Sequence, residues 1–173
     1  MDKTNSSKPK MGRAAEISKF LEKIVVNAGV GKLSQQPNFE QKILEQVLRD
    51  LSTIAGQKPE ERKAKKSISG FKIREGQIVG VKITLRRKKM VDFFERLITI
   101  VLPRVRDFRG IDTDSIDSVG TLNIGFSEQM VFPEINPEES PVIFSLGINV
   151  VPRNKKREEA VAEYRRLGVP LKK

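Results

Sequence analysis

Apolar residues in this 173-residue chain repeat at two different spacings, and the chain changes from one spacing to the other several times. Between residues 23 and 31 every second residue is apolar, and Asn27 belongs to the other set. A period of two predicts a β-strand with one buried face, and it turns Asn27 away from the core. Over residues 38–55 the apolar residues recur at three and four positions instead, which predicts an amphipathic helix that ends at Gly56.

The remaining apolar residues form further segments of the same two kinds. Spacing predicts a strand over residues 78–85, a core helix over 90–108, strands within 119–132 and 142–151, and a closing helix with Asn154 as its N-cap. Strands and helices interleave, but without the strict strand–helix–strand order of a parallel sheet. The sequence therefore predicts a two-layer α+β fold, in which helices pack on one face of a largely antiparallel β-sheet. The other face of the sheet is free for a ligand.

Positive charge gathers in one part of the chain. Residues 57–90 contain twelve Lys or Arg against three Glu, and so carry nine of the eleven net positive charges. Within this stretch, Phe71 stands between Gly70 and Lys72, which places an aromatic ring beside a cation. Such a surface can hold phosphates by charge while a base stacks on the ring. RNA is therefore the predicted ligand.

Two other interpretations of the basic stretch are open at this point. A cationic face can serve solubility alone, although solubility does not require charge to gather beside an aromatic residue. An anionic membrane surface also attracts Lys and Arg, but residues 57–90 lack the apolar helical stripe of a membrane-inserting segment. RNA remains the favoured partner, and no membrane partner is expected.

Length and composition fit one folded domain with a short tail. Residues 1–12 contain several Lys and no apolar periodicity, which predicts a mobile basic tail. Residues 13–173 are predicted to form a single RNA-binding α+β domain, because 38% hydrophobic residues suffice for a core and no linker is visible. The longest apolar run, residues 97–102, is far shorter than the roughly 20 residues that span a bilayer. With no secretory signal either, a cytoplasmic location is expected.

The residue types present exclude much of catalytic chemistry. The chain has no His and no Cys, so it can form no Ser-His or Cys-His pair and no thiolate metal site. One carboxylate cluster, Asp112, Asp114 and Asp117, resembles a cation-binding loop, but Ile116 interrupts the spacing of the oxygen ligands. A solvated acidic loop is the favoured interpretation, and a Mg²⁺-dependent nuclease is the enzyme alternative. No metal or other cofactor is predicted.

Several segments of the chain resemble one known family. They read, in order, EKIVVNAGVG, IAGQKPEERKAKKSISGFKIREGQIVGVKITLRRKKM, FFERLITIVLPRVRDFRGI and SEQMVFPEIN. From about Glu22 to Pro152, the chain resembles the bacterial form of universal large-subunit ribosomal protein five. The resemblance implies a structural ribosomal protein that is not an enzyme. Without it, the charge pattern alone indicates only a general basic RNA-binding protein.

The resemblance also implies partners. A member of this family binds 5S rRNA, helps to attach it in the central protuberance, and touches neighbouring large-subunit RNA and proteins. It contacts P-site tRNA and forms an inter-subunit bridge with small-subunit protein thirteen. The ribosome in the cytoplasm is the implied location.

Matching the motifs residue by residue assigns three sets of contacts. The implied rRNA-binding residues are Asn27, Gln57, Phe71 and Thr84, with Lys63, Lys65 and Lys66 as electrostatic attachment. The implied tRNA contacts are Ser69, Gly70, Lys72 and Arg74. The implied bridge residues are Arg109, Asp112 and Asp114.

Overall fold

The protein folds around one five-stranded antiparallel sheet. The computed structural model describes residues 12–154 and 156–172. The strands are β1 (Leu21–Gly29), β2 (Glu60–Lys63), β3 (Ile78–Leu85), β4 (Leu122–Phe126) and β5 (Leu146–Pro152). Their order across the sheet is β2-β3-β1-β5-β4, and each neighbouring pair is antiparallel. The predicted antiparallel sheet is confirmed.

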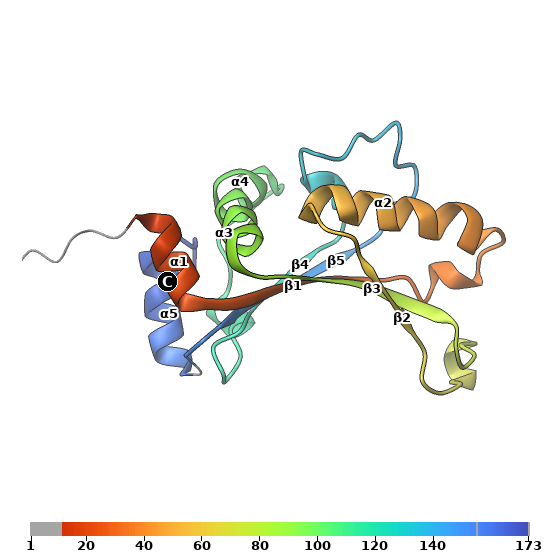
Figure 1. Ribbon diagram of the computed structural model, residues 1–173, viewed down its shortest axis with the longest axis horizontal. Coiled ribbons are helices and arrows are strands. Elements are labelled where there is room, and N and C mark those ends of the chain that lie inside the picture. The colour runs from red at the N-terminus through yellow and green to blue at the C-terminus, as the bar shows by residue number, and fades with distance from the viewer. Residues whose placement is uncertain (1–11, 155, 173) are drawn as a thin grey trace, which may run out of the picture.

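Helices cover one side of this sheet and one of its ends. The helices are α1 (Arg13–Phe20), α2 (Leu44–Ala55), α3 (Arg87–Arg96), α4 (Leu102–Arg104) and α5 (Arg157–Arg166). A π-helical turn precedes α2 (Phe39–Ile43), and another joins α3 to α4 (Leu97–Val101). Figure 1 shows α2, α3 and α4 above the sheet, with α1 and α5 at its end. This arrangement confirms the predicted two-layer α+β fold.

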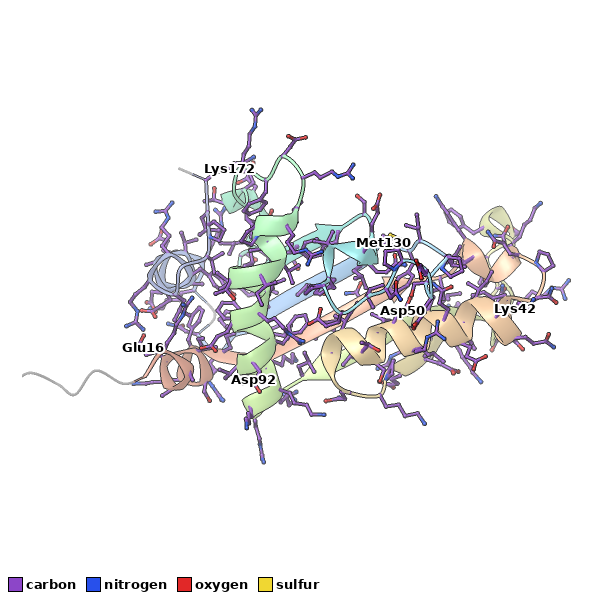
Figure 2. All side chains as sticks on the ribbon, turned by 90° about the horizontal axis from the view of Figure 1, so that it is seen from above. Glu16, Lys42, Asp50, Asp92, Met130 and Lys172 are labelled. Carbon is purple, nitrogen blue, oxygen red and sulfur yellow. The ribbon has the colours of Figure 1, made fainter. Side chains whose placement is uncertain are left out.

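The core lies between the sheet and the helices above it. On β1, Ile24, Val26 and Ala28 are buried, whereas Asn27 between them is only partly buried. The α3 helix contributes Phe93 and Phe94, which are also buried. Seen from above, α3 lies across the strands, whereas α2 runs roughly along them (Figure 2). The period-two and helical patterns in the sequence therefore meet in one hydrophobic core, and the polar residues of the strands face the other way.

The ends of two helices test the sequence prediction in detail. The helical segment before Gly56 ends as predicted, because Gly56 adopts a φ of +63° and its N–H donates to the Ser52 carbonyl at 2.8 Å. The closing helix does not begin at Asn154, since α5 starts at Arg157 with Lys156 at the cap position. The Asn154 side chain donates instead to the carboxylate of Glu159. It therefore does not cap the helix.

The sequence predicted a mobile N-terminal tail and no segment that spans a bilayer. The predicted mobile tail, residues 1–12, lies outside the described residues except for Gly12. Within the described residues, the structure contains no helix long and apolar enough to cross a bilayer.

Tyr164 joins α5 to the sheet through its hydroxyl group. The hydroxyl donates toward the carbonyl oxygens of Gly120 at 3.1 Å and Val150 at 3.0 Å. Its ring meets the Phe20 ring edge-on, with centroids 5.1 Å apart. Burial raises the pKa of the Tyr164 hydroxyl above its ordinary value of 10.0. The neutral hydroxyl is therefore the form that the folded state stabilises.

We expect Tyr164→Phe to lower the free energy of unfolding by about 1 kcal/mol at neutral pH, because buried carbonyls lose a donor. Since the folded pKa is raised, the contribution of Tyr164 is complete below about pH 10 and declines as the pH rises further. The chain has one Tyr, so tyrosinate absorbance in an alkaline titration reports this residue alone. Ionisation near pH 10 in the still-folded protein would show that the hydroxyl is not buried.

Candidate nucleic-acid interface

The face of the sheet opposite α2 and α3 carries polar and small residues. Cross-strand pairing places Asn27 of β1 beside Lys82 of β3 on one side and Gly147 of β5 on the other. The neighbouring row pairs Val25 with Thr84 and with Asn149. Residues that face one side of a sheet pack with their cross-strand neighbours. This open sheet face therefore presents amides, a hydroxyl and a cation where the buried face presents aliphatic side chains.

Two further sequence-predicted residues are in contact at this sheet. The Gln57 side chain, which follows α2, donates from Nε2 to the backbone carbonyl of Thr84 at 3.2 Å. Both residues are partly buried. Gln57, Thr84 and Asn27 come from three separate segments of the sequence, and pairing of β1 with β3 brings them into one region. Three of the predicted rRNA-binding residues therefore lie in one region of the sheet.

A basic loop, residues 64–77, connects β2 to β3. Its base is closed by hydrogen bonds from Ala64 N–H to the Gln77 carbonyl at 2.8 Å and from Gly76 N–H to the Ala64 carbonyl at 2.9 Å. Its tip is closed by reciprocal backbone bonds between Ile68 and Ile73, at 2.9 and 3.2 Å. The loop therefore has its own hairpin structure. Figure 1 shows it descending from the sheet on the side away from α2.

Phe71 lies at the tip of the basic loop with 68% of its surface exposed. Exposure of a large aromatic side chain in a charged loop is unusual for a residue that serves packing. The other tip residues that the resemblance assigns to tRNA are also exposed: Ser69, Gly70, Lys72 and Arg74. The ring and the cations are thus available to a ligand together.

Hydrogen bonds hold the basic loop against the turn that follows β1. Gln35 donates from Nε2 to the Phe71 carbonyl at 2.8 Å, and Gln77 donates from Nε2 to Ser34 Oγ at 2.7 Å. No sequence pattern indicated these contacts, because the paired residues are far apart along the chain. Their effect is to fix the position of the loop relative to the sheet.

The open sheet face and the loop tip form one continuous surface. A hollow beside the loop is lined by residues that include Gly29, Phe71 and Ser145. The next hollow is lined by residues that include Asn27, Gly29 and Ser145. Because the two hollows share Gly29 and Ser145, a ligand that stacks on Phe71 can reach Asn27 without leaving the surface. We call this surface the Asn27–Phe71 face.

The lysines of the predicted attachment site lie next to this region. Lys63 ends the edge strand β2, and Lys65 and Lys66 begin the basic loop. All three are exposed. Exposed cations near a polar surface attract phosphate groups over a range that salt shortens.

The predicted bridge residues occupy a different part of the molecule. Arg109, Asp112 and Asp114 are exposed in the segment between α4 and β4. Asp112 pairs with Lys172 at 3.3 Å, and Asp114 approaches Arg157 at 3.6 Å. Figure 2 shows Lys172 far from the end of the sheet that carries the basic loop. The acidic loop is therefore separate from the Asn27–Phe71 face, and its charge is partly balanced by the C-terminal segment.

The three carboxylates of the acidic loop do not converge on one point. Asp117 accepts, through Oδ1, the backbone N–H groups of Val119 at 3.0 Å and Thr121 at 2.7 Å, which shapes a turn before β4. In the described part of the chain, no group of three or more His, Cys, Asp or Glu is placed to hold a metal ion. The described residues therefore show no carboxylate cluster that fits the metal site of the nuclease alternative.

The sequence reasoning missed several residues on the open face, among them Asn149 and Gly147. Their signal was present, because the alternation within residues 142–151 places both on the polar side of the predicted strand. It was weak, since neither residue carries charge or belongs to a motif that the resemblance assigns.

Together, the fold and this surface define a basic α+β protein of the RNA-binding class. Comparison with known proteins identifies the family. Residues 20–74 match the family model described as "Ribosomal protein L5", and residues 78–171 match the model for the C-terminus of the same ribosomal family. The chain belongs to the ribosomal protein L5 family.

Individual relatives agree with this assignment. The chain is 48% identical over 153 residues to large ribosomal subunit protein uL5 of Chlorobaculum tepidum, covering 88% of this chain and 81% of the relative. It is 43% identical over 170 residues to uL5 of Fusobacterium nucleatum, covering 95% and 91%. The predicted family is therefore confirmed. Membership makes the chain a ribosomal protein of the large subunit, located in the ribosome in the cytoplasm, and RNA binding follows from it.

Proposed function

We propose that this ribosomal protein is a structural component that binds 5S rRNA through the Asn27–Phe71 face and helps to attach it in the central protuberance. The proposal is carried by one observation: an aromatic ring with 68% exposure shares a continuous surface with the polar strand residues of the open sheet face. Irregular folded RNA offers unstacked bases and ribose hydroxyls to such a surface. Neighbouring large-subunit RNA and proteins complete its surroundings.

Residues of different chemistry make different kinds of contact with the RNA in this proposal. Phe71 provides a stacking surface for a base. Asn27, Gln57 and Thr84 provide short amide and hydroxyl groups that suit a 2′-hydroxyl, a phosphate oxygen or a base edge. The exposed Lys63, Lys65 and Lys66 attach the phosphate backbone without reading its sequence. No catalytic residue is needed for this role, and we infer that the protein is not an enzyme.

The tip of the basic loop is the proposed contact with P-site tRNA. Ser69, Gly70, Lys72 and Arg74 are exposed there, and small residues beside cations suit a nucleic-acid backbone that must bind and leave. Lys72 adopts a φ of +52°, which ends the short helical turn and directs the chain back toward β3. The hairpin structure of the loop keeps these groups together at its end.

The segment with Arg109, Asp112 and Asp114 is the proposed inter-subunit bridge to small-subunit protein thirteen. The three residues are exposed and of mixed charge. Exposed ion pairs contribute little energy individually, so pairs such as Asp112 with Lys172 can exchange partners at small cost. Such exchange suits a contact between subunits that move relative to each other.

Retention of 5S rRNA on filters tests the proposed function. We expect tighter binding to 5S rRNA than to a control RNA of the same length. We also expect affinity to fall as the salt concentration rises. In a plot of log affinity against log salt concentration, each phosphate engaged should contribute roughly −0.7 to −0.9 to the slope. Equal affinity for the two RNAs would favour the alternative of a general basic RNA-binding protein. An affinity that does not change with salt would contradict the electrostatic attachment.

A further inference from the structure

A row of three asparagines crosses the open sheet face from β1 through β5 to β4. Asn27 of β1 donates from Nδ2 to Asn149 Oδ1 of β5 at 2.8 Å. Asn149 in turn donates from Nδ2 to Asn123 Oδ1 of β4 at 2.5 Å. Side-chain amides in a hydrogen-bonded row hold one another in a single orientation, because each amide is both donor and acceptor. We call this row the asparagine ladder.

The far end of the ladder fixes its direction. Asn123 Nδ2 faces the backbone carbonyls of Ser115 at 3.3 Å and Thr121 at 3.4 Å. A carbonyl oxygen can only accept, so the Asn123 NH₂ group must point toward these two oxygens. Its Oδ1 is left to accept from Asn149, and the oxygen of Asn149 is left to accept from Asn27. Two backbone carbonyls in the segment that precedes β4 therefore determine which way the amide of Asn27 faces.

The residue beneath the Asn27 side chain is Gly147, and the distances around it leave no room for a larger residue. Gly147 is paired with Asn27 across the β1–β5 ladder. A Cβ atom at position 147 would lie 2.6 Å from Asn27 Oδ1 and 3.2 Å from its Cγ and Nδ2. These distances are too short for van der Waals contact, so any larger residue would move the Asn27 side chain. The absence of a side chain at Gly147 lets the amide lie flat against the sheet.

We propose that Asn149 and Gly147 are positioning residues, which set the orientation in which Asn27 meets RNA. This inference rests on the proposed function, because it requires Asn27 to contact the RNA. The ladder uses one N–H of Asn27, and no described residue donates a hydrogen bond to its Oδ1. Asn27 therefore presents its carbonyl oxygen and its second amide N–H to the ligand. The ligand group that matches both is one that donates and accepts hydrogen bonds, such as a ribose 2′-hydroxyl or a base edge.

Affinity for 5S rRNA tests this proposal in single and paired variants. We expect Asn149→Ala and Gly147→Ala each to weaken binding roughly fivefold, the effect of about one hydrogen bond, without changing the melting temperature. In the Asn27→Ala background, the same two substitutions should have no further effect, because there is no amide left to orient. Asn136→Ala, in the loop between β4 and β5, is the matched control and should bind like the unchanged protein.

A second measurement follows the Asn27 amide in the free protein. Its hydrogen-bonded side-chain proton should exchange slowly in NMR spectra, and Asn149→Ala should speed its exchange. A residue that acted only on overall stability would not change this one signal. Fast exchange in the unchanged protein would overturn the ladder as a positioning device.

The outcomes separate this inference from the proposed function. If Asn27→Ala weakens 5S rRNA binding but Asn149→Ala and Gly147→Ala do not, the positioning inference fails and the proposed function stands. If Asn27→Ala itself has no effect while Phe71→Ala does, the inference fails together with the role of Asn27. If the paired variants show the full sum of the single effects, the two residues act independently of Asn27, and the inference is overturned.

Discussion

Phe71→Ala is expected to weaken 5S rRNA binding by about 1 to 3 kcal/mol while leaving the melting temperature unchanged. The loss reflects removal of a ring on which a base stacks. Stability should not change, because 68% of the Phe71 surface is already exposed and its substitution opens no cavity. Filter binding and thermal unfolding of the same samples measure the two quantities.

Two variants sharpen the interpretation of Phe71. Phe71→Trp retains a stacking surface and should keep most of the affinity, whereas Phe71→Leu retains apolar area without a ring and should behave like Phe71→Ala. Ile100→Ala removes another exposed apolar side chain, 43% exposed on the helical side, and should bind normally. Full affinity in Phe71→Leu would show that the ring is not used for stacking. Unfolding of Phe71→Ala would place the residue in the core.

Gly120→Ala is expected to destabilise the fold by roughly 2 to 4 kcal/mol, because two costs combine. Gly120 adopts a φ of +81°, which a residue with a Cβ atom adopts only with strain. The added Cβ would also lie 2.7 Å from the Cβ of Ala160 and 3.3 Å from Cγ of Pro152, both parts of the core side of α5 and β5. For a chain of this length, the melting temperature should fall by roughly 5 to 15 °C.

Gly125→Ala is the matched control for this effect on stability. Gly125 lies in β4, has no positive φ, and has open space around the position of a Cβ atom. Its replacement should therefore leave the melting temperature unchanged or slightly raised. An equal fall in both variants would mean that glycine content, and not the close approach at Gly120, decides the stability of this region.

The surface residues show which parts of the site were predictable. The charge of residues 57–90 and the placement of Phe71 between Gly70 and Lys72 predicted an exposed basic loop with an exposed ring, and both are found. The period of two predicted that Asn27 faces away from the core. The bonds from Gln35 and Gln77 that position the loop were not predictable, because they join side chains to distant segments. Hydrogen bonds of this kind depend on which strands become neighbours.

Two buried polar residues of α2 make contacts that the sequence could not predict either. Gln46 of α2 donates from Nε2 to the Val142 carbonyl at 2.9 Å and accepts the Val142 N–H at 3.2 Å. Asp50 of the same helix accepts from the Ser140 hydroxyl at 2.9 Å, and Figure 2 shows it on the side of α2 that faces the loop after β4. From the spacing of apolar residues alone, both residues would be assigned to the solvent-facing side of an amphipathic helix. They are buried because that loop folds over α2 and supplies partners for their polar groups.

The sequence did not predict α1 or the edge strand β2, and its predicted core helix over residues 90–108 ends at Arg104 in the structure. By itself it determined the other four strands, the helices α2, α3 and α5, the antiparallel α+β class, the basic loop and the family. These depend on residue spacing and on local charge, which any segment carries with it. Only the tertiary structure decided the strand order β2-β3-β1-β5-β4, and with it the meeting of Asn27 with Gly147 and Asn149. The physical reason is that strand pairing joins residues that are more than a hundred positions apart, and no local pattern specifies the partner.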